Sequence, residues 1–134
     1  MKTLIALALL IALPLPACAD ARPVAVDAIV DGDTFRSGGQ NIRLWGINAP
    51  EHGQRYFFAA AAMLEKLLYS GPVKCAQKDT DKYQRPVMQC FVNGQDIGAA
   101  LVRSGLAKDF THFSKGAYSK EQSTARKESL GIWK

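Results

Sequence analysis

Two short motifs hold the residue types needed to act on a phosphodiester. Hydrolysis of that bond requires neutralised phosphate oxygens, a deprotonated water and a stabilised leaving oxygen, which a divalent metal, arginines and a carboxylate base can supply. The first motif, Asp31-Gly32-Asp33-Thr34, places two carboxylates at a tight turn. Such a turn could direct an oxygen ligand at a hard cation such as calcium. Taken alone, it is more often a hairpin turn with solvated aspartates.

The second motif runs from Arg43 to Glu51 and reads Arg-Leu-Trp-Gly-Ile-Asn-Ala-Pro-Glu. An arginine within a strand points to one face of the sheet, where its guanidinium could bind a phosphate through two hydrogen bonds. Pro50 stiffens the loop that presents Glu51, and a carboxylate on a rigid loop is a candidate base. An ordinary salt bridge would also account for Arg43.

A third motif, Asp81-Lys82-Tyr83-Gln84-Arg85, is a charged loop with a second arginine. Arg85 could stabilise a transition state from the side opposite Arg43. In isolation, a solvated connection is the simpler interpretation. The order and combination of the motifs therefore carry the argument.

Followed by Ala-Leu-Val-Arg-Ser-Gly-Leu-Ala-Lys at 100–108, these motifs resemble the staphylococcal nuclease family. The resemblance extends from about Val26 to the Gly131-Ile132-Trp133 ending. It implies an α+β fold, namely an OB-fold five-stranded β-barrel with three helices. It also implies a bound calcium ion and hydrolysis of DNA and RNA, preferably single-stranded, to 3′-phosphate ends.

The resemblance also assigns roles residue by residue. Asp33 matches the first calcium carboxylate, and the backbone carbonyl of Ala49 matches a further ligand. Arg43 and Arg85 match the arginines that bind phosphate in the transition state. Glu51 matches the residue proposed to activate water.

The chain departs from the family pattern at two site positions. Asn48 stands where the family usually has a second calcium-binding aspartate, which predicts weaker metal binding because one negative charge is lost. Gln84 stands where glycine is common, so a positive φ there would strain the backbone or move Arg85. The further candidates for contact with substrate are Lys82, Tyr83 and Phe113; the last could stack on a base.

Periodicity predicts the elements that must position these residues. Short strands are expected at 24–30, 34–36, 42–47, 73–76 and 87–92, and helices at 54–69, 97–104 and 118–130. Turns are expected at Gly38-Gly39 and Asn93-Gly94. Five strands with a helix after the third independently favour an OB fold, a shape often used for nucleic acids and sugars.

The length of 134 residues allows one domain. Residues 1–21 have the features of a signal peptide, which leaves 22–134 as the OB-fold domain and predicts a periplasmic or secreted protein. Removal of 1–21 takes away Lys2 and Asp20, so the formal net charge stays at +5. A small basic domain attracts polyanions. Nothing in the sequence points to a protein partner or an oligomer, so a monomer is expected.

The three cysteines are interpreted in the light of the predicted export. Cys18 lies in Leu15-Pro16-Ala17-Cys18, which resembles a lipobox and leaves open a lipoprotein anchored through Cys18. Cys75 and Cys90 remain as an even pair, and export favours a disulfide between them over two free thiols. They fall on the strands that flank the Arg85 loop, where a cross-link would stabilise the fold by roughly 3 kcal/mol.

Three functions stay open at this point. An active calcium-dependent nuclease accounts for the retention of all the catalytic types, since a protein that only binds has no need of Glu51. A catalytically weakened or inactive nucleic-acid-binding OB-fold module would account for Asn48 and Gln84. A basic structural or interaction domain drawn to acidic surfaces would leave the motif set unexplained.

Overall fold

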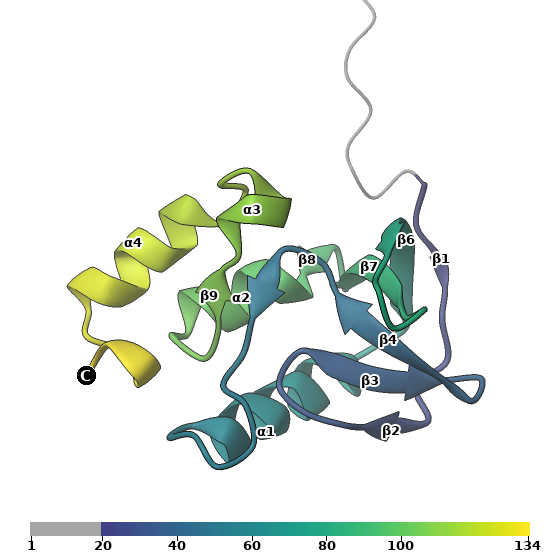
Figure 1. Ribbon diagram of the computed structural model, residues 1–134, viewed down its shortest axis with the longest axis horizontal. Coiled ribbons are helices and arrows are strands. Elements are labelled where there is room, and N and C mark those ends of the chain that lie inside the picture. The colour runs from purple at the N-terminus through teal and green to yellow at the C-terminus, as the bar shows by residue number, and fades with distance from the viewer. Residues whose placement is uncertain (1–19) are drawn as a thin grey trace, which may run out of the picture.

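A computed structural model describes residues 20–134, so the predicted signal peptide, the lipobox and Cys18 lie almost entirely outside the described residues. Figure 1 shows the arrangement of the elements. The strands are β1 (Arg22–Pro23), β2 (Ala28–Ile29), β3 (Thr34–Ser37), β4 (Gln40–Leu44), β5 (Ile47–Asn48), β6 (Val73–Thr80), β7 (Pro86–Val92), β8 (Gln95–Asp96) and β9 (Lys108–Asp109). The helices are α1 (Phe57–Leu68), α2 (Ile97–Arg103), α3 (Thr111–Ser114), α4 (Ser119–Lys127) and the 3₁₀ turn η2 (Gly131–Trp133).

The main sheet is curled, with strand order β1-β6-β7-β4-β3-β2, and β8 pairs with β7. All its pairings are antiparallel except that of β4 with β7. Two short strands, β5 and β9, form a separate antiparallel pair. This sheet with its helices confirms the predicted α+β OB fold. The predicted numbers, five strands and three helices, are too low for residues 20–134, where short strands and α3 are additional elements.

Two hairpin turns explain much of the register. Gly38 and Gly39 have φ of 55° and 79° and join β3 to β4, while Asn93 and Gly94 have φ of 50° and 75° and join β7 to β8. Two consecutive residues at positive φ make the tight turn that suits the strand twist, which is why these dipeptides were informative in the sequence.

The predicted strand at 42–47 is wrong beyond Leu44. Gly46 has a φ of 74°, and the chain turns there, so Ile47 and Asn48 leave the main sheet and pair with β9 instead. Ile47 is therefore buried with the core and does not share a sheet face with Arg43. Of the strand predicted at 24–30, only β2 forms, and β1 lies just before that range. Strand β6 continues to Thr80, beyond its predicted end at residue 76.

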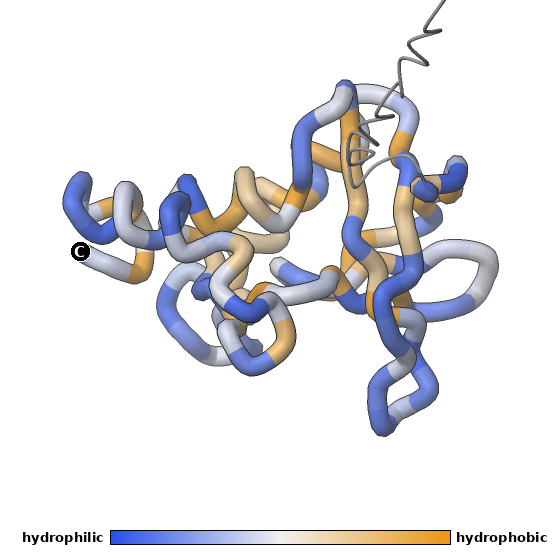
Figure 2. Tube along the Cα trace, turned by 90° about the horizontal axis from the view of Figure 1, so that it is seen from above, coloured by the Kyte–Doolittle hydropathy of each residue, from blue (hydrophilic) through white to orange (hydrophobic). Residues whose placement is uncertain are grey.

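The core lies between the curled sheet and helices α1 and α2. Its centre consists of side chains with no exposed surface, which include Phe35, Ile47, Leu64, Ile97 and Leu101. Figure 2 shows hydrophobic residues towards the interior of the trace, while the projecting loops and the segment before the C-terminus are largely hydrophilic. None of the helices in residues 20–134 has the length and apolar character needed to cross a membrane.

The disulfide prediction is confirmed. Cys75 on β6 lies directly opposite Cys90 on β7, and the two sulfur atoms are bonded. This cross-link joins the two strands from which the Arg85 loop projects.

Candidate active site

The bend at Asp31–Asp33 buries an aspartate because of the glycine between them. Gly32 lies so close to α1 and to the site loop that an added Cβ would be 2.6 Å from the Cβ of Ala60 and 2.8 Å from that of Ala49. Only glycine allows this approach. The next residue, Asp33, is consequently buried with 5% exposure at the edge of the core.

The Asp33 carboxylate accepts several hydrogen bonds. Ala49 donates its backbone N–H to Asp33 Oδ2 at 2.8 Å, and Thr34 donates its hydroxyl to Oδ1 at 3.2 Å. Arg43 Nη2 lies 3.3 Å from Oδ2. Burial outweighs these favourable contacts and raises the pKa of Asp33 to about 6, and the neighbouring Asp31 carboxylate adds to the shift. Because its burial is not fully compensated, the charged Asp33 carboxylate would be stabilised by a second cation beside it.

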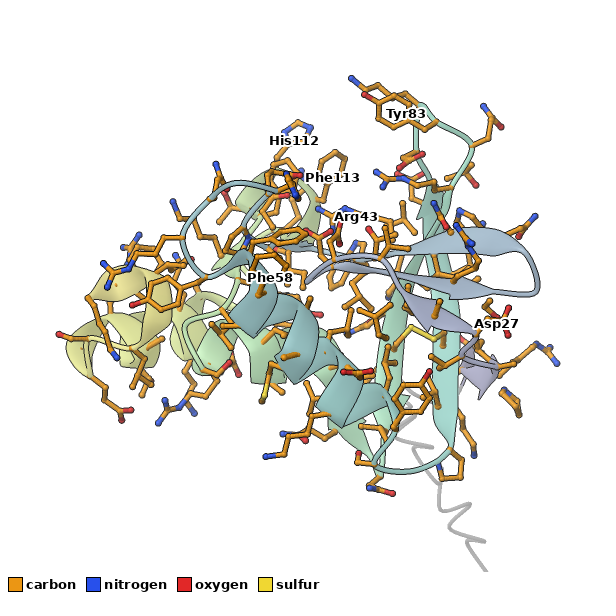
Figure 3. The ribbon with its side chains drawn as sticks, turned by 90° about the horizontal axis from the view of Figure 1, so that it is seen from below. Asp27, Arg43, Phe58, Tyr83, His112 and Phe113 are labelled. Carbon is orange, nitrogen blue, oxygen red and sulfur yellow. A yellow bond between two sulfur atoms is a disulfide. The ribbon has the colours of Figure 1, made fainter. Side chains whose placement is uncertain are left out.

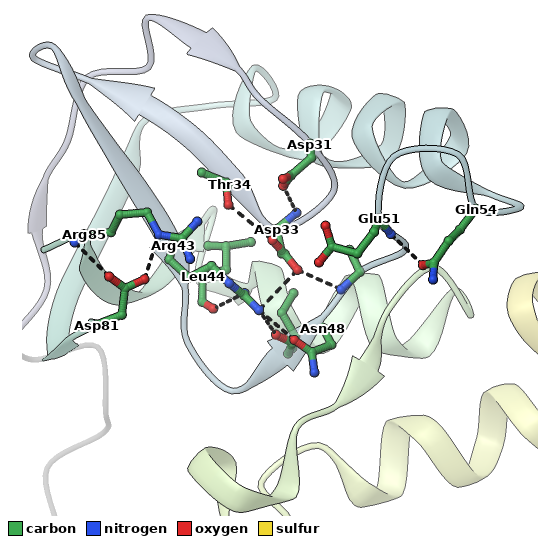
Figure 4. A network of polar contacts seen from close by, with 12 residues as sticks. Asp31, Asp33, Thr34, Arg43, Leu44, Asn48, Glu51, Gln54, Asp81 and Arg85 are labelled. Atoms are coloured by element: carbon green, nitrogen blue, oxygen red, sulfur yellow. Dashed lines mark hydrogen bonds and ion pairs between the residues drawn. The ribbon is translucent and has the colours of Figure 1, made fainter. Parts of the chain in front are cut away.

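The Arg43 guanidinium donates hydrogen bonds to the loop that follows β4 (Figure 4). Nη1 donates to the carbonyl of Leu44 at 2.8 Å, and Nη2 donates to the carbonyl of Ile47 at 2.7 Å and to Asn48 Oδ1 at 2.8 Å. The arginine thus fixes the β4–β5 turn as well as facing Asp33. To bind phosphate through both nitrogens, it must exchange some of these contacts.

Glu51 lies just beyond this network on an exposed loop. Its backbone N–H donates to Gln54 Oε1 at 2.7 Å, and the Gln54 N–H donates back to the Glu51 carbonyl at 2.9 Å. This reciprocal turn and Pro50 hold the loop while the Glu51 carboxylate remains exposed to water. His52 stacks edge-on against Phe57 at 5.3 Å, which agrees with an ordinary loop histidine.

Asp81 organises the loop that carries the second arginine. Its carboxylate accepts hydrogen bonds from the backbone N–H groups of Tyr83 and Arg85, each at 2.9 Å, and from the Arg85 Nε at 2.7 Å. Desolvation alone would raise the pKa of Asp81, but the hydrogen bonds from Arg85 and Tyr83 hold it below its ordinary value. Gln84 has a φ of 62°, so this position does require the backbone conformation that favours glycine.

Two grooves flank strand β5. The first, which we call the aromatic groove, has a volume of about 550 Å³ and is lined by Arg43, Trp45, Lys82, Tyr83, Arg85 and Phe113 among others. The second, the basic groove, has a volume of about 630 Å³ and is lined by Asn48, Ala49, Glu51, Arg55, Tyr56 and Lys108 among others. The two arginines therefore share one groove, whereas Glu51 lines the other.

The substrate-contact candidates all lie in the aromatic groove. Tyr83 is 68% exposed and Phe113 is 47% exposed. Figure 3 shows Tyr83 and Phe113 projecting on the same side of the molecule, beyond Arg43. Lys82 Nζ lies 5.1 Å from the centre of the Tyr83 ring, and the Arg85 guanidinium lies 5.5 Å from it. This wall combines aromatic faces with positive charge.

The candidate metal-ligand oxygens at this site suit a hard cation but carry little negative charge. The Asp33 carboxylate, the Asn48 amide oxygen and the Ala49 carbonyl are oxygen ligands of the kind calcium prefers. The raised pKa of Asp33 is the observation that supports a fit, because a cation would offset the cost of its burial. Nowhere in residues 20–134 do three His, Cys, Asp or Glu side chains gather as a metal-binding group. Asn48 also directs its oxygen to Arg43, which a cation would have to share.

The sequence placed Asp31, Thr34 and Asp81 in motifs but did not predict their contacts with Asp33 and Arg85, and it did not single out Gln54 beside Glu51. Only the spacings of Glu51 with Gln54 and of Asp81 with Arg85 gave any signal, because side chains three or four residues apart can bond within a turn. Lys108 was also missed as a neighbour of Asn48, and no local pattern could have revealed it.

A model of the family described as staphylococcal nuclease homologue matches residues 41–134. The chain belongs to the staphylococcal nuclease family. Membership agrees with the OB fold and with the motif set around Arg43, and it supports a hydrolytic nuclease that acts on nucleic acid.

Individual relatives agree with the family assignment. A protein of Haemophilus influenzae named as an uncharacterized endonuclease is 32% identical, over 98% of this chain and 78% of its own. A micrococcal nuclease of Shigella flexneri is 30% identical, over 96% of this chain and 83% of its own. The succinoglycan biosynthesis protein ExoI of Rhizobium meliloti is 33% identical over 85% of this chain, which spans 66% of that relative.

Proposed function

We propose that the protein is an exported nuclease that hydrolyses phosphodiester bonds of DNA and RNA with a bound calcium ion and leaves 3′-phosphate ends. The observation that carries the proposal is the contact network in which Asp33, Arg43, Asn48 and Ala49 meet. Glu51 follows this network directly, and Arg85 lines the same groove as Arg43. Burial raises the pKa of Asp33 and so lowers the stability of the fold at neutral pH, a cost that a fold without a catalytic site has no need to bear.

Glu51 is the proposed general base. Its carboxylate is exposed and the loop beneath it is held by Gln54. It accepts a proton from the attacking water as the water oxygen bonds to phosphorus. The bond from phosphorus to the 5′ oxygen breaks, and that oxygen takes up a proton to become a hydroxyl. The phosphate stays on the 3′ side.

Arg43 and Arg85 stabilise the charge that accumulates on the phosphate oxygens. Asp81 accepts the Nε of Arg85, which leaves that guanidinium's Nη groups to donate to phosphate. Arg43 serves the same purpose once the phosphate replaces its contacts to the Leu44 and Ile47 carbonyls. Calcium, when held by the Asp33 carboxylate, the Asn48 amide oxygen and the Ala49 carbonyl, would supply further neutralisation of phosphate charge.

Single strands are the proposed preferred substrate. Tyr83 and Phe113 offer exposed ring faces beside the two arginines, and unpaired bases stack on such faces whatever their sequence. Bases in a duplex are already stacked on one another and cannot use them. Lys82 would add attraction for the phosphates.

Export is supported by the disulfide between Cys75 and Cys90, since such bonds persist in oxidising compartments. The proposed location is the periplasm or the medium, with a lipoprotein anchored through Cys18 as the alternative. We propose that the protein acts as a monomer.

A second candidate function is a nucleic-acid-binding module with weakened or lost catalysis. Two observations favour it. Asn48 brings no negative charge to the proposed metal and bonds to Arg43, and Gln84 occupies a conformation suited to glycine next to Arg85.

The test is cleavage of single-stranded DNA during a calcium titration from trace to tens of millimolar, with EDTA as the blank. The nuclease should cut only at high calcium, and Asn48→Asp should lower the calcium requirement by restoring a negative ligand. Glu51→Gln should abolish cutting while binding persists. Cutting by Asn48→Asp alone would support the binding module, and wild-type cutting by Glu51→Gln would remove Glu51 as the base.

A further inference from the structure

The phenol of Tyr118 is a buried polar group that the chemistry described above does not use. Tyr118 directly precedes α4, is 3% exposed and lines neither groove. Its hydroxyl donates to both carboxylate oxygens of Asp96, at 3.0 Å and 3.2 Å. Burial and the charge of Asp96 raise the pKa of the Tyr118 phenol, so the group keeps its proton and remains a donor. A hydrogen bond to a carboxylate away from water holds both of its partners firmly.

Asp96 is a fixed anchor for that hydroxyl. It is the N-cap of α2, where Oδ1 accepts a hydrogen bond from the backbone N–H of Ala99 at 3.2 Å and Oδ2 accepts one from Gln89 Nε2 at 2.7 Å. An added Cβ on Gly98, in the first turn of α2, would lie 3.0 Å from the Tyr118 hydroxyl oxygen. Glycine at that position lets the phenol reach the cap. The hydroxyl is thus bonded to a residue that α2 and strand β7 both hold in place.

The ring of Tyr118 lies against the turn that joins β4 to β5. It meets the ring of Trp45 edge-on, with the ring centres 5.8 Å apart. An added Cβ on Gly46 would lie 3.1 Å from the Tyr118 ring and 3.1 Å from the Cβ of Ser114. The Gly46 carbonyl also accepts a hydrogen bond from the backbone N–H of Phe110 at 2.8 Å. The turn is therefore packed closely against α3 and the start of α4.

The same turn carries the acceptors of Arg43. The guanidinium donates to the carbonyls of Leu44 and Ile47, which flank the turn, and to Asn48 Oδ1. A movement of the turn therefore moves these acceptors and changes where the guanidinium points. A catalytic group displaced by about 1 Å can lose on the order of 10²-fold in rate.

We propose that Tyr118 is a positioning residue for Arg43. Its hydroxyl bond to Asp96 holds the ring against the β4–β5 turn, and the turn holds the guanidinium in the orientation that receives phosphate. The phenol acts through this packing and takes no part in proton transfer. This inference rests on the proposed function, in which Arg43 stabilises charge on the phosphate oxygens.

The experiment breaks the bond between Tyr118 and Asp96 from either end. Tyr118→Phe removes only the hydroxyl, and Asp96→Ser keeps a short capping hydroxyl for α2 that does not reach the phenol. The matched control is Ser104→Ala, which removes a hydroxyl that donates to the Leu101 carbonyl at 2.9 Å, at the other end of α2. Cleavage of single-stranded DNA is measured in saturating calcium, and urea unfolding checks that each variant is folded.

Tyr118→Phe and Asp96→Ser should each lower kcat on the order of 10-fold, and Ser104→Ala should lower it by less than about 2-fold. The deciding measurement repeats Tyr118→Phe in two backgrounds. With Arg43→Lys already present, the further loss should shrink below about 3-fold, because the guanidinium that Tyr118 positions is gone. With Arg85→Lys present, the loss of about 10-fold should remain.

A second readout does not depend on cleavage. In ¹⁵N-labelled protein, the side-chain N–H resonance of Arg43, assigned by its absence from Arg43→Lys, should shift or broaden in Tyr118→Phe. The corresponding resonance of Arg85, assigned with Arg85→Lys, should stay unchanged because Asp81 holds that arginine in a separate loop.

Equal losses in the two arginine backgrounds would overturn the proposal and leave Tyr118 with a purely structural role. Cleavage by Tyr118→Phe at the rate of the parent, or an unchanged Arg43 resonance, would also overturn it. Failure of the proposed function gives a different result, since the parent protein itself would cut nothing. The Arg43 resonance would then still decide whether Tyr118 positions that guanidinium.

Discussion

The site contains two aspartate–arginine pairs with opposite electrostatics. Asp33 and Arg43 are 3.3 Å apart, with side-chain exposures of 8% and 15%, and the pKa of Asp33 rises to about 6. Asp81 and Arg85 are 2.7 Å apart, with exposures of 20% and 30%, and the pKa of Asp81 falls below its ordinary value. Compared with a free aspartate, the environment therefore shifts Asp33 towards the neutral acid and Asp81 towards the carboxylate.

Burial and the direction of the backbone account for the difference. Asp33 is surrounded by the core, faces the like charge of Asp31 and shares its arginine with two carbonyls and Asn48. Asp81 lies in an open loop that offers it two backbone N–H groups along with the arginine. Near the core, the desolvation cost of the ion pair exceeds its favourable contacts, whereas in the loop the hydrogen bonds from Arg85 and Tyr83 outweigh it. We infer that the burial of Asp33 serves function directly, whereas Asp81 fixes the loop that presents Arg85.

The largest expected effect comes from breaking the buried pair. Arg43→Gln leaves Asp33 buried without its cation, so the free energy of unfolding should fall by about 3 kcal/mol. Arg85→Gln should lower it by less than about 1 kcal/mol, because that pair is partly exposed. Urea unfolding at pH 7 measures both. Cleavage should fall on the order of 10²- to 10³-fold in each variant, since each loses a donor to the transition state.

Equal stability losses in the two variants would contradict the contrast between the pairs. A matched control is Arg103→Gln, which breaks the exposed bidentate pair with Glu128, and neither residue lines either groove. It should leave cleavage unchanged.

The pH dependence of stability should have opposite signs for the two aspartates. The pKa of Asp33 is raised from 3.8 to about 6, so the native state holds that proton more tightly than the unfolded state. In EDTA, the resulting stability is present below about pH 4 and is lost as the pH rises through 6, by up to about 3 kcal/mol. Asp81 has a lowered pKa, so its contribution is present above its unfolded pKa and is lost on acidification.

Chemical unfolding between pH 3 and 8 separates these contributions. Asp33→Asn should flatten the decline between pH 4 and 6 while the acid limb remains. Asp81→Asn should reduce the acid limb and keep the decline. A wild-type protein whose stability does not fall between pH 4 and 6, or an Asp33→Asn variant with an unchanged decline, would refute the raised pKa.

The smallest effect is expected from relieving the loop of Arg85. Gln84 holds a φ of 62°, which costs a residue with a side chain about 1 kcal/mol relative to glycine. The greater freedom of glycine in the unfolded chain offsets part of this gain. Gln84→Gly should therefore stabilise the protein by roughly 0.5 kcal/mol, measured by thermal unfolding.

The same variant tests whether Gln84 displaces Arg85. Because Asp81 already fixes Arg85 through two hydrogen bonds, Gln84→Gly should change cleavage by less than about 3-fold. A gain above tenfold would mean that glutamine holds the arginine away from the substrate, and would favour the weakened-module interpretation.

Local chemistry made much of the fold predictable. The Gly38-Gly39 and Asn93-Gly94 turns, helices α1 and α2, and the Cys75–Cys90 pair follow from residue types whose conformational preferences act over a few positions. The end of β4 did not follow, because Trp45 and Ile47 continue the hydrophobic alternation of a strand. Gly46 adopts its turn where an added Cβ would meet Ser114 and Tyr118 at 3.1 Å, far along the chain.

The sequence by itself determined which chemical groups this protein has: the carboxylates of Asp33 and Glu51, the guanidinium groups of Arg43 and Arg85, and the order that identifies the family. Tertiary structure alone decided their state. It buried Asp33 and raised its pKa, turned Asn48 towards Arg43, and paired Asn48 with Lys108 across β5 and β9. Burial and long-range pairing depend on segments brought together by the fold, and a one-dimensional pattern contains no measure of either.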